Sequence, residues 1–505
     1  MSRRTAFLAS ISSFLGNLWE VFTVSLLEGS YRCWDMSNVT IPRGQPPRPT
    51  TGRRVQQRRA LMRPTMSRLV SSDILSIAAA VIIVVTGLWA TRGGGWSDIQ
   101  KGGYNWWRAS SSLSGLYTSL SGIFGLLLAS RTRWIERAIG LDKMLIWHRV
   151  MGDMMGILLG VHIFTSIPAE MQFRGGLMNT IRDMVGREPY MALTTVGAAI
   201  VGIVVISSLK NVRNKLSYET WYFMHLTVYF GLAASFSHQI TLGSLLSNDR
   251  LTRIGWVIAC ALVFATALVG RWWRVLQSVS NPLHVRDIRR ETPETVSVLL
   301  GGRNILAMRG DAGQFIMMRS LIPGQWWKTN PYSLSNAPTT AGMRVTIKDR
   351  GDASRAVRRL QVGDRVAVEG PYGVTTPLVF NDHKPLFIAG GVGITPVVAM
   401  MQRLPADSNP IVLLRARKEA DVAHLAELQQ LAAQRGGEVV VLTGATAAMK
   451  GNDPFAGQAL LRAVPDLQQR AALVCGPNSL LFAARKGLLE AGMKKNNIHV
   501  ELPWW

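Results

Sequence analysis

Six long apolar segments between residues 69 and 270 constrain this 505-residue chain more than any other feature. They cover approximately residues 69–91, 109–130, 144–167, 190–209, 219–240 and 251–270. Each is long enough to cross about 30 Å of hydrocarbon, which takes a helix of about 20 residues. Charged residues make up only 17% of the chain, against about 25% in soluble domains. The sequence therefore predicts an integral membrane protein and excludes a disordered chain.

The net charge of +25 is unusual for so apolar a chain. The excess of Lys and Arg is spread over the N-terminal segment, the apolar segments and the C-terminal half, instead of forming one basic arm. This distribution argues against a nucleic-acid partner. The three cysteines, Cys33, Cys260 and Cys475, lie far apart, so the sequence encodes neither a disulfide framework nor a thiolate metal site. A metal would have to be held by other ligands.

The positive charges beside the apolar segments predict the orientation of the chain. Four Lys/Arg clusters fall on one side if six spans alternate in direction, and basic flanks are typical of the cytoplasmic side. The clusters are Arg53, Arg54, Arg58, Arg59, Arg63 and Arg68, then Arg131, Arg133, Arg137 and Lys143, then Lys210, Arg213 and Lys215, and finally Arg271 and Arg274. We expect six spans in the plasma (inner) membrane, with both termini and the whole C-terminal half in the cytoplasm.

The chain divides into four predicted regions. Residues 1–68 suggest an amphipathic helix lying on the membrane, followed by a basic linker; a seventh span is the alternative for the helix. Residues 69–274 form the six-span membrane domain. In residues 281–376, short strands at Thr295–Leu300, Gln314–Met318, Met343–Lys348 and Arg365–Glu369 indicate an antiparallel β-barrel. In residues 384–505, strands at Pro385–Ala389, Ile411–Arg415, Glu438–Leu442 and Ala472–Cys475 alternate with helices, which indicates a parallel α/β domain.

Four of the eight histidines lie within predicted spans. His148 and His162 are in the third span, and His225 and His238 are in the fifth, which runs in the same direction. Fourteen residues bring His162 back to within about 40° of His148, about 21 Å further along the helix. Thirteen residues leave His225 and His238 about 140° apart, so the fifth span needs a kink or bulge to turn both to one side.

Matched in depth, these histidines form an inner pair, His148/His225, and an outer pair, His162/His238. Each pair can bind an iron from two sides, and two bis-His haems would carry electrons across the bilayer. Intramembrane histidines are costly and are usually functional. The alternative interpretation is that they are polar residues hydrogen-bonded to neighbouring helices.

The C-terminal half contains three glycine-containing motifs after the predicted strands. Gly351-Asp352-Ala353-Ser354 opens a helix twenty residues after Asn330-Pro331-Tyr332-Ser333. Gly390-Gly391-Val392-Gly393-Ile394-Thr395-Pro396 follows a buried strand and opens a helix, where free N–H groups suit a pyrophosphate. Cys475-Gly476-Pro477 ends a late strand. Each motif alone can be an ordinary turn, but their order and spacing are more specific.

Together these motifs resemble the ferredoxin–NADP reductase superfamily. With six spans and the paired histidines in front, residues 69–505 resemble the NADPH oxidase/ferric reductase family of transmembrane flavocytochromes. The resemblance implies a flavin site: Tyr332 would pack on the FAD ring, and Ser333 would hydrogen-bond near its reactive nitrogen. Gly351 and Ser354 match the turn that holds the FAD pyrophosphate. The family has Arg or His where this chain has Asn330, which implies a more loosely held FAD.

The resemblance also implies a site for the nicotinamide cofactor. The matching dinucleotide loop comprises Gly391, Gly393, Thr395 and Pro396. Cys475 and Gly476 match the motif beside the nicotinamide, and Trp505, or alternatively Trp504, would stack on the flavin until the nicotinamide displaces it. Arg417 matches a position that often meets the 2′-phosphate, which favours NADPH over NADH. The remaining histidines, His284, His383, His424 and His499, are interpreted as surface or structural.

The function implied is transmembrane electron transfer. Cytoplasmic NADPH would reduce FAD, and electrons would pass through the inner and then the outer b-type haem to an extracytoplasmic acceptor, either dioxygen, giving superoxide, or ferric iron. One alternative is a flavin reductase that feeds a membrane quinone or a partner protein. Another, from a different class, is a channel or transporter with a redox-sensing cytoplasmic domain.

Overall fold

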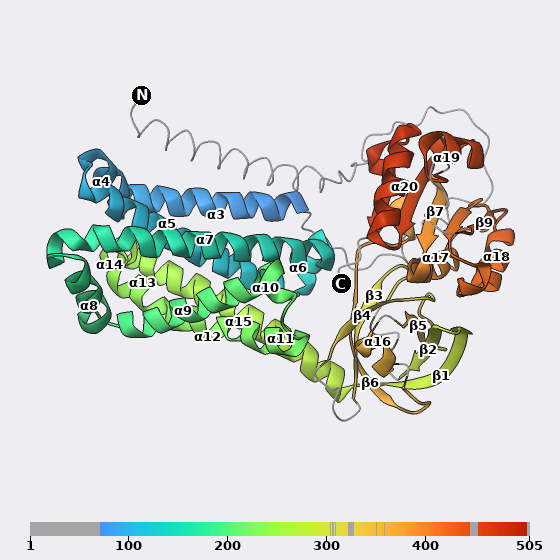
Figure 1. The fold of residues 1–505 in the computed structure, drawn as a ribbon, viewed down its shortest axis with the longest axis horizontal. Coiled ribbons are helices and arrows are strands. Elements are labelled where there is room, and N and C mark those ends of the chain that lie inside the picture. Colours follow the sequence, from blue (N-terminus) through green and yellow to red (C-terminus); the bar gives the residue numbers. More distant parts are fainter. Residues whose placement is uncertain are drawn as a thin grey trace, which may run out of the picture. The chain divides into compact units, whose positions relative to one another are not determined.

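The computed structural model describes residues 71–302, 305, 308, 310–321, 328–349, 351–357, 359–444 and 453–501. The expected N-terminal helix and linker, and the terminal Trp504 and Trp505, lie outside these residues. The chain divides into two compact units (Figure 1): a helical unit, Ser76–Ser280, and a second unit that includes Asn281–Trp505. The exact domain boundaries given above stay predictions.

Five helices of the described chain are long and apolar enough to span a membrane. They are α3 (Ser71–Thr91), α5 (Tyr104–Ala129), α7 (Leu141–Arg174), α9 (Met191–Ser208) and α15 (Arg250–Ser280). Large apolar side chains on their outer faces are exposed, among them Ile83, Phe164 and Leu262. Backbone groups satisfied within each helix, together with an apolar exterior, are what a lipid environment requires.

The predicted fifth span is divided into three short helices, α11 (Tyr218–Leu226), α12 (Val228–Ala234) and α13 (Phe236–Leu242). The divisions fall at Thr227 and Ser235, where ψ rises to −14° and −3°. Their hydroxyls donate back to the carbonyls of Met224 and Gly231, at 2.7 and 2.9 Å, a pattern that bends helices. The kink required by the thirteen-residue histidine spacing is present. Six continuous spans are not seen in the described part of the chain, and the count of six stays a prediction.

Short helices connect the long ones: α4 (Gly95–Lys101), α6 (Arg133–Ile139), α8 (Leu177–Arg187), α10 (Lys210–Arg213) and α14 (Ser244–Asn248). Helices α5 and α7 pack against each other along most of their length. Glycines of α5 make this approach possible. A Cβ added to Gly115 would lie 2.9 Å from the His162 ring, and one added to Gly122 would lie 3.3 Å from Met155.

The second unit begins with a six-stranded antiparallel sheet in the order β4-β3-β6-β1-β2-β5. The strands are β1 (Leu283–Thr292), β2 (Thr295–Gly301), β3 (Phe315–Ser320), β4 (Asn330–Ser333), β5 (Met343–Lys348) and β6 (Arg365–Tyr372). An isolated antiparallel bridge between Leu334 and Val345 links the residue after β4 to β5, the opposite edge strand. The predicted antiparallel strands are present, whereas β1 and β4 had not been predicted as strands. A fully closed barrel stays a prediction.

A five-stranded parallel sheet follows, in the order β11-β10-β7-β8-β9. Its strands are β7 (Lys384–Gly390), β8 (Ile411–Arg415), β9 (Glu438–Leu442), β10 (Arg470–Cys475) and β11 (Ile498–Glu501). Alternate residues of β7 face opposite sides, so that Phe387 packs toward α17 (Ile394–Met401) and α18 (Leu425–Ala433). Leu386 and Ile388 pack toward α19 (Gly457–Ala463) and α20 (Asn478–Glu490). Helices therefore cover both faces, as a parallel sheet requires.

Candidate functional site

The inner histidine pair is brought together between α7 and α11. The ring centroids of His148 and His225 lie 5.9 Å apart, with an interplanar angle of 79°. His148 Nδ1 lies 2.9 Å from the carbonyl oxygen of Gly125, and His225 Nδ1 lies 3.4 Å from the hydroxyl of Ser208. A carbonyl oxygen only accepts, so His148 Nδ1 is the donor and its Nε2 is left with a lone pair.

An aromatic and cationic stack covers His225. The Trp221 ring stacks on the His225 ring with centroids 4.9 Å apart, and the Arg213 guanidinium lies 4.6 Å from the Trp221 centroid. The Trp221 indole N–H donates to the same Ser208 hydroxyl at 3.3 Å. Ser208 and Trp221 together fix the plane of the His225 ring.

The outer pair lies further along α7, facing α13. The ring centroids of His162 and His238 are 6.2 Å apart. His162 Nδ1 donates to the carbonyl oxygen of Ser111 at 2.8 Å. His238 Nδ1 is buried and has no hydrogen-bond partner among the described residues, which is an unusual condition for a buried polar atom.

Both pairs fit bis-His ligation of a haem iron. Each pair brings two imidazole rings together, with centroids 5.9 and 6.2 Å apart, and imidazole nitrogen is a common ligand of iron. The Nδ1 bonds of His148 and His162 to backbone carbonyls are the outer contacts that orient metal-binding histidines.

The residues expected at the flavin lie in the antiparallel sheet. Tyr332 and Ser333 are on β4, where Tyr332 pairs with Ile316 of β3 and packs on the core of the sheet. Burial raises the pKa of the Tyr332 hydroxyl, so it stays protonated. Gly351 precedes α16 (Asp352–Val357) at a φ of +135°, and a Cβ added there would meet nothing within 4 Å. The Ser354 hydroxyl donates to the Gly351 carbonyl at 2.8 Å, so this turn is both fixed and open on one side.

The residues expected at the nicotinamide come together at the carboxyl edge of the parallel sheet. Gly391 and Gly393 follow β7, and Cys475 and Gly476 end and follow the neighbouring strand β10. A Cβ added to Gly393 would lie 2.3 Å from the Cys475 carbonyl oxygen, so only glycine allows this contact. The direction of connection reverses between β7 and β10, and such a switch point is where ligands bind in open α/β sheets.

Other side chains complete this edge. The Thr395 hydroxyl donates to the Val392 carbonyl at 2.8 Å, and Thr395 and Pro396 are buried in the first turn of α17. Cys475 is fully buried; burial, and the nearby Glu501, raise the pKa of its thiol well above the usual value. Arg417 follows β8 and has an exposed side chain. The expected aromatic lid, Trp504 or Trp505, lies outside the described residues.

Sequence reasoning missed the residues that hold the histidines. Gly125 and Ser111 act through backbone carbonyls, which leave no trace in a sequence. Trp221 had a readable signal, because it precedes His225 by four residues, about one helical turn.

Comparison with known families places both units. A model described as "Ferric reductase like transmembrane component" matches residues 114–236, and one described as "Oxidoreductase NAD-binding domain" matches residues 387–486. The first region contains His148, His162 and His225, and His238 lies two residues beyond its end. The second contains the turn after β7 and the Cys475-Gly476 motif.

Several curated proteins are similar to part of this chain. An NADPH oxidoreductase of Mycobacterium tuberculosis is 29% identical over 245 residues, which cover 44% of this chain and 62% of the relative. The ferredoxin reductase component of 3-ketosteroid-9-alpha-monooxygenase from Mycolicibacterium smegmatis is 29% identical over 231 residues, or 44% and 64%. A Bordetella pertussis flavohemoprotein is 30% identical over 209 residues, or 38% and 52%. The chain thus spans between half and two thirds of the length of these relatives.

Among solved structures, a flavohemoglobin from Malassezia yamatoensis aligns with 81% of this chain and 98% of its own, at 16% identity and a TM-score of 0.41. The FAD/NAD-binding domain of a Vibrio cholerae nitric oxide dioxygenase aligns with 44% of this chain and 97% of its own, at 23% identity and a TM-score of 0.34.

The two family matches define a class: a membrane domain of the ferric reductase type joined to an NAD-binding oxidoreductase module. This combination matches a fusion of the ferric reductase/NADPH oxidase type, and the resemblance predicted from the sequence is confirmed.

Proposed function

We propose that this protein is a transmembrane oxidoreductase that takes electrons from cytoplasmic NADPH and delivers them to an acceptor on the opposite side of the membrane. The observation that carries the proposal is the pair of histidine couples on α7 and the broken helix α11–α13, with centroids 5.9 and 6.2 Å apart. The inner couple, His148/His225, and the outer couple, His162/His238, would each hold one b-type haem. When bound, FAD accepts hydride from the nicotinamide, and haems carry single electrons.

The chain's own part in the membrane is to position the paired histidines. Carbonyl oxygens of α5 accept from His148 and His162, which turns the Nε2 atom of each ring away from α5. Gly115 leaves room for the His162 ring. Orientation of this kind is what second contacts contribute to a metal site.

In the second unit, the chain's part is to bind and orient two dinucleotides. Tyr332 and Ser333 on β4 and the open turn at Gly351 support the assignment of the flavin site. The Gly391–Pro396 turn, packed on Cys475 and Gly476, supports the nicotinamide site. The buried Cys475 thiol stays protonated near neutral pH, because burial raises its pKa. It therefore borders the site as a neutral group and does not act as a nucleophile.

We further propose NADPH, with NADH as the alternative, because Arg417 follows β8 at the same carboxyl edge and is exposed. A guanidinium there suits a 2′-phosphate. The proposed acceptor is dioxygen or ferric iron, and the proposed location is the plasma (inner) membrane with six spans and both termini cytoplasmic.

An NADPH-driven assay in membranes that contain the full chain tests the proposal. Cytochrome c reduction that superoxide dismutase suppresses would identify dioxygen as the acceptor, whereas reduction of ferric chelates that the dismutase does not affect would identify ferric iron. If neither acceptor is reduced while added quinone is, the protein is instead a flavin reductase of the quinone-feeding type.

A further inference from the structure

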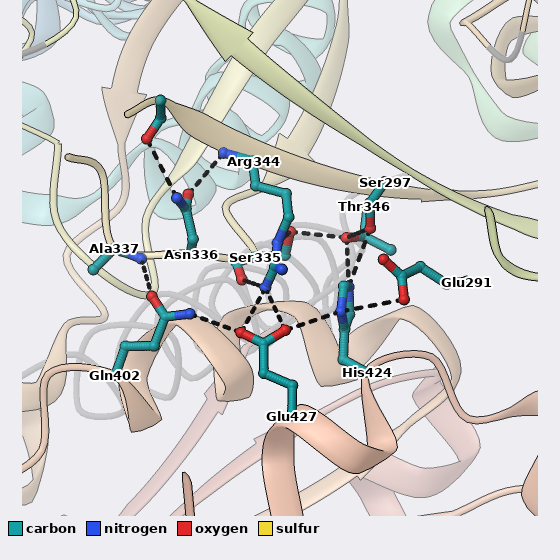
Figure 2. Close-up of polar contacts among 11 residues, drawn as sticks. Glu291, Ser297, Ser335, Asn336, Ala337, Arg344, Thr346, Gln402, His424 and Glu427 are labelled. Carbon is teal, nitrogen blue, oxygen red and sulfur yellow. Dashed lines mark hydrogen bonds and ion pairs between the residues drawn. The ribbon is translucent and has the colours of Figure 1, made fainter. Parts of the chain in front are cut away.

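A network of polar side chains joins the two sheets of the second unit (Figure 2). The antiparallel-sheet side contributes Glu291, Ser297, Ser335, Asn336, Ala337, Arg344 and Thr346; the parallel-sheet side contributes Gln402, His424 and Glu427. These residues are far apart in the sequence, so the network exists only in the folded unit. It offers a direct connection between the two candidate binding regions.

His424 is the centre of the network. Its side chain is 2% exposed, and its φ of +58° is rare for a non-glycine residue. Nδ1 lies 3.3 Å from a carboxylate oxygen of Glu427 and 3.5 Å from one of Glu291. Nε2 lies 2.8 Å from the Thr346 hydroxyl. Because carboxylate oxygens only accept, Nδ1 is the donor, and the ring bridges α18 to β1 and β5.

Glu427 forms the ion pair between the parallel-sheet side and the antiparallel-sheet side of the network. Both of its carboxylate oxygens accept from Arg344, at 2.9 and 3.0 Å, and one also accepts from the Gln402 amide at 2.9 Å. Burial raises the pKa of Glu427, but His424 and Arg344 outweigh that effect and lower it to about 2. The carboxylate is therefore ionised at neutral pH and balanced by partners from both sides.

The network ends beside each candidate site. Arg344 Nε donates to the Ser335 hydroxyl at 3.2 Å, and Ser335 lies two residues after Ser333 on the expected flavin segment. Gln402 follows α17, the helix that begins at the Gly391–Gly393 turn, and accepts from the Ala337 N–H at 2.9 Å. Thr346 also lines a small pocket together with Gly391 and Thr395.

We propose that His424, Glu427, Arg344 and Gln402 are positioning residues that hold the Tyr332–Ser333 segment in register with the Gly391–Pro396 turn. This rests on the proposed function, since the register matters only if flavin and nicotinamide bind those two segments. Hydride transfer needs the reacting atoms at about 3–3.5 Å, and a 1 Å misplacement can cost about 100-fold in rate. The network thus sets the rate of flavin reduction, while leaving the groups that bind NADPH unchanged.

Rapid mixing of NADPH with the purified, FAD-loaded full chain tests this. The limiting rate of flavin reduction reports alignment, and the NADPH concentration for half-maximal rate reports binding. We expect Glu427→Gln and His424→Ala to lower the limiting rate about 10-fold to 100-fold, with apparent NADPH affinity within about twofold of wild type. The charge-transfer absorbance between nicotinamide and flavin should fall in parallel.

Conservative and control variants separate alignment from folding. His424→Gln keeps a donor and an acceptor in the site, and we expect it to recover most of the rate. Gln402→Ala removes one bridge at lower risk to the fold, and we expect a loss of about threefold. His383→Ala, at an exposed histidine, should have no effect.

Three results would overturn the positioning role. They are limiting rates within twofold of wild type in all network variants, a loss of rate only in proportion to lost FAD, and failure of His424→Gln to differ from His424→Ala. The wild type separates this inference from the proposed function: if NADPH does not reduce its flavin, the proposed function fails. Normal reduction in the wild type together with unchanged variants removes the positioning role alone.

Discussion

The helical unit and the two-sheet unit position their functional residues in different ways. In the helical unit, a few single contacts hold the histidines, such as the 2.8 Å bond from His162 to the Ser111 carbonyl of α5. In the two-sheet unit, the candidate residues lie at strand ends and are fixed by close backbone packing, as at Gly393 against Cys475. The first arrangement depends on helix periodicity and the second on chain topology.

This difference implies that the two units fail independently. A change at a histidine pair would remove a proposed haem site without touching the sheets. A change at a glycine turn removes nucleotide binding without touching the helices. The following predictions test that separation, from the largest expected effect to the smallest.

His162→Ala has the largest predicted effect. The outer site would lose one of the two histidines proposed to hold its haem, and we expect haem content to fall from about two to about one per chain. Electron delivery across the membrane should stop, while NADPH still reduces the flavin at the wild-type rate. Haem extraction and flavin absorbance measure the two quantities on one sample.

His284→Ala is the control, because His284 is exposed and lies in the other unit. Unchanged haem content in both His162→Ala and His225→Ala would show that the ligand assignment is wrong.

Gly393→Ala should impair nucleotide binding and leave the haem content unchanged. Its Cβ would lie 2.3 Å from the Cys475 carbonyl oxygen, so the turn must move, at a cost of about 1–3 kcal/mol. We expect NADPH affinity to fall at least about tenfold and haem content to stay at wild type. Gly160→Ala, where a Cβ meets nothing within 4 Å, is the matched control. A loss of haem in Gly393→Ala would contradict the independence of the units.

Two glycines of α5 provide a matched pair within the membrane. A Cβ at Gly115 would lie 2.9 Å from the His162 ring, whereas one at Gly125 would lie 3.8 Å from His148, an ordinary contact. Gly115→Ala should therefore change the electron paramagnetic resonance signal of the outer haem, and Gly125→Ala should leave both signals unchanged. Equal changes of the signals in the two variants would mean that α5 does not constrain the His148 and His162 rings in the way described.

The smallest predicted effect is the loss of folding stability in Glu427→Gln. The pKa of Glu427 is lowered from 4.5 to about 2 in the folded chain, so its ionised form stabilises the fold above about pH 4.5, and that contribution is lost as pH falls toward 2. Because the side chain is partly exposed, we expect a loss of about 1–2 kcal/mol at pH 7. Guanidinium unfolding at pH 7, 5 and 3 should show the difference narrowing only below about pH 4.5. A constant difference would assign the effect to packing.

Much of this architecture could be predicted from the sequence where the signal is local. The strands Ile411–Arg415, Glu438–Leu442 and Met343–Lys348 have the bounds expected from their apolar runs. The fourteen-residue spacing of His148 and His162 correctly predicted a shared face of α7, since both meet partners there. Helix periodicity and buried strands depend on residues that are close together in the sequence, which is why both could be predicted from it.

Features that depend on partners far away in the sequence could not be predicted from it. Strand β1 carries several charged residues and β4 is four residues long with a proline, so neither has an apolar run. His424 was interpreted only as surface or structural, yet it is buried against Thr346 and Ser297, which are 78 and 127 residues away. Such pairings are determined by the packing of the two sheets against each other, for which a single sequence carries no periodic signal.

The central claim is that this chain carries electrons across a membrane, and sealed vesicles test it most directly. The full chain is reconstituted with FAD and haem, ferricyanide is trapped inside as an impermeant acceptor, and NADPH is added only outside. We predict that external NADPH reduces the internal ferricyanide, and that His162→Ala abolishes this reduction. Reduction only when ferricyanide and NADPH share one side of the membrane would contradict the account.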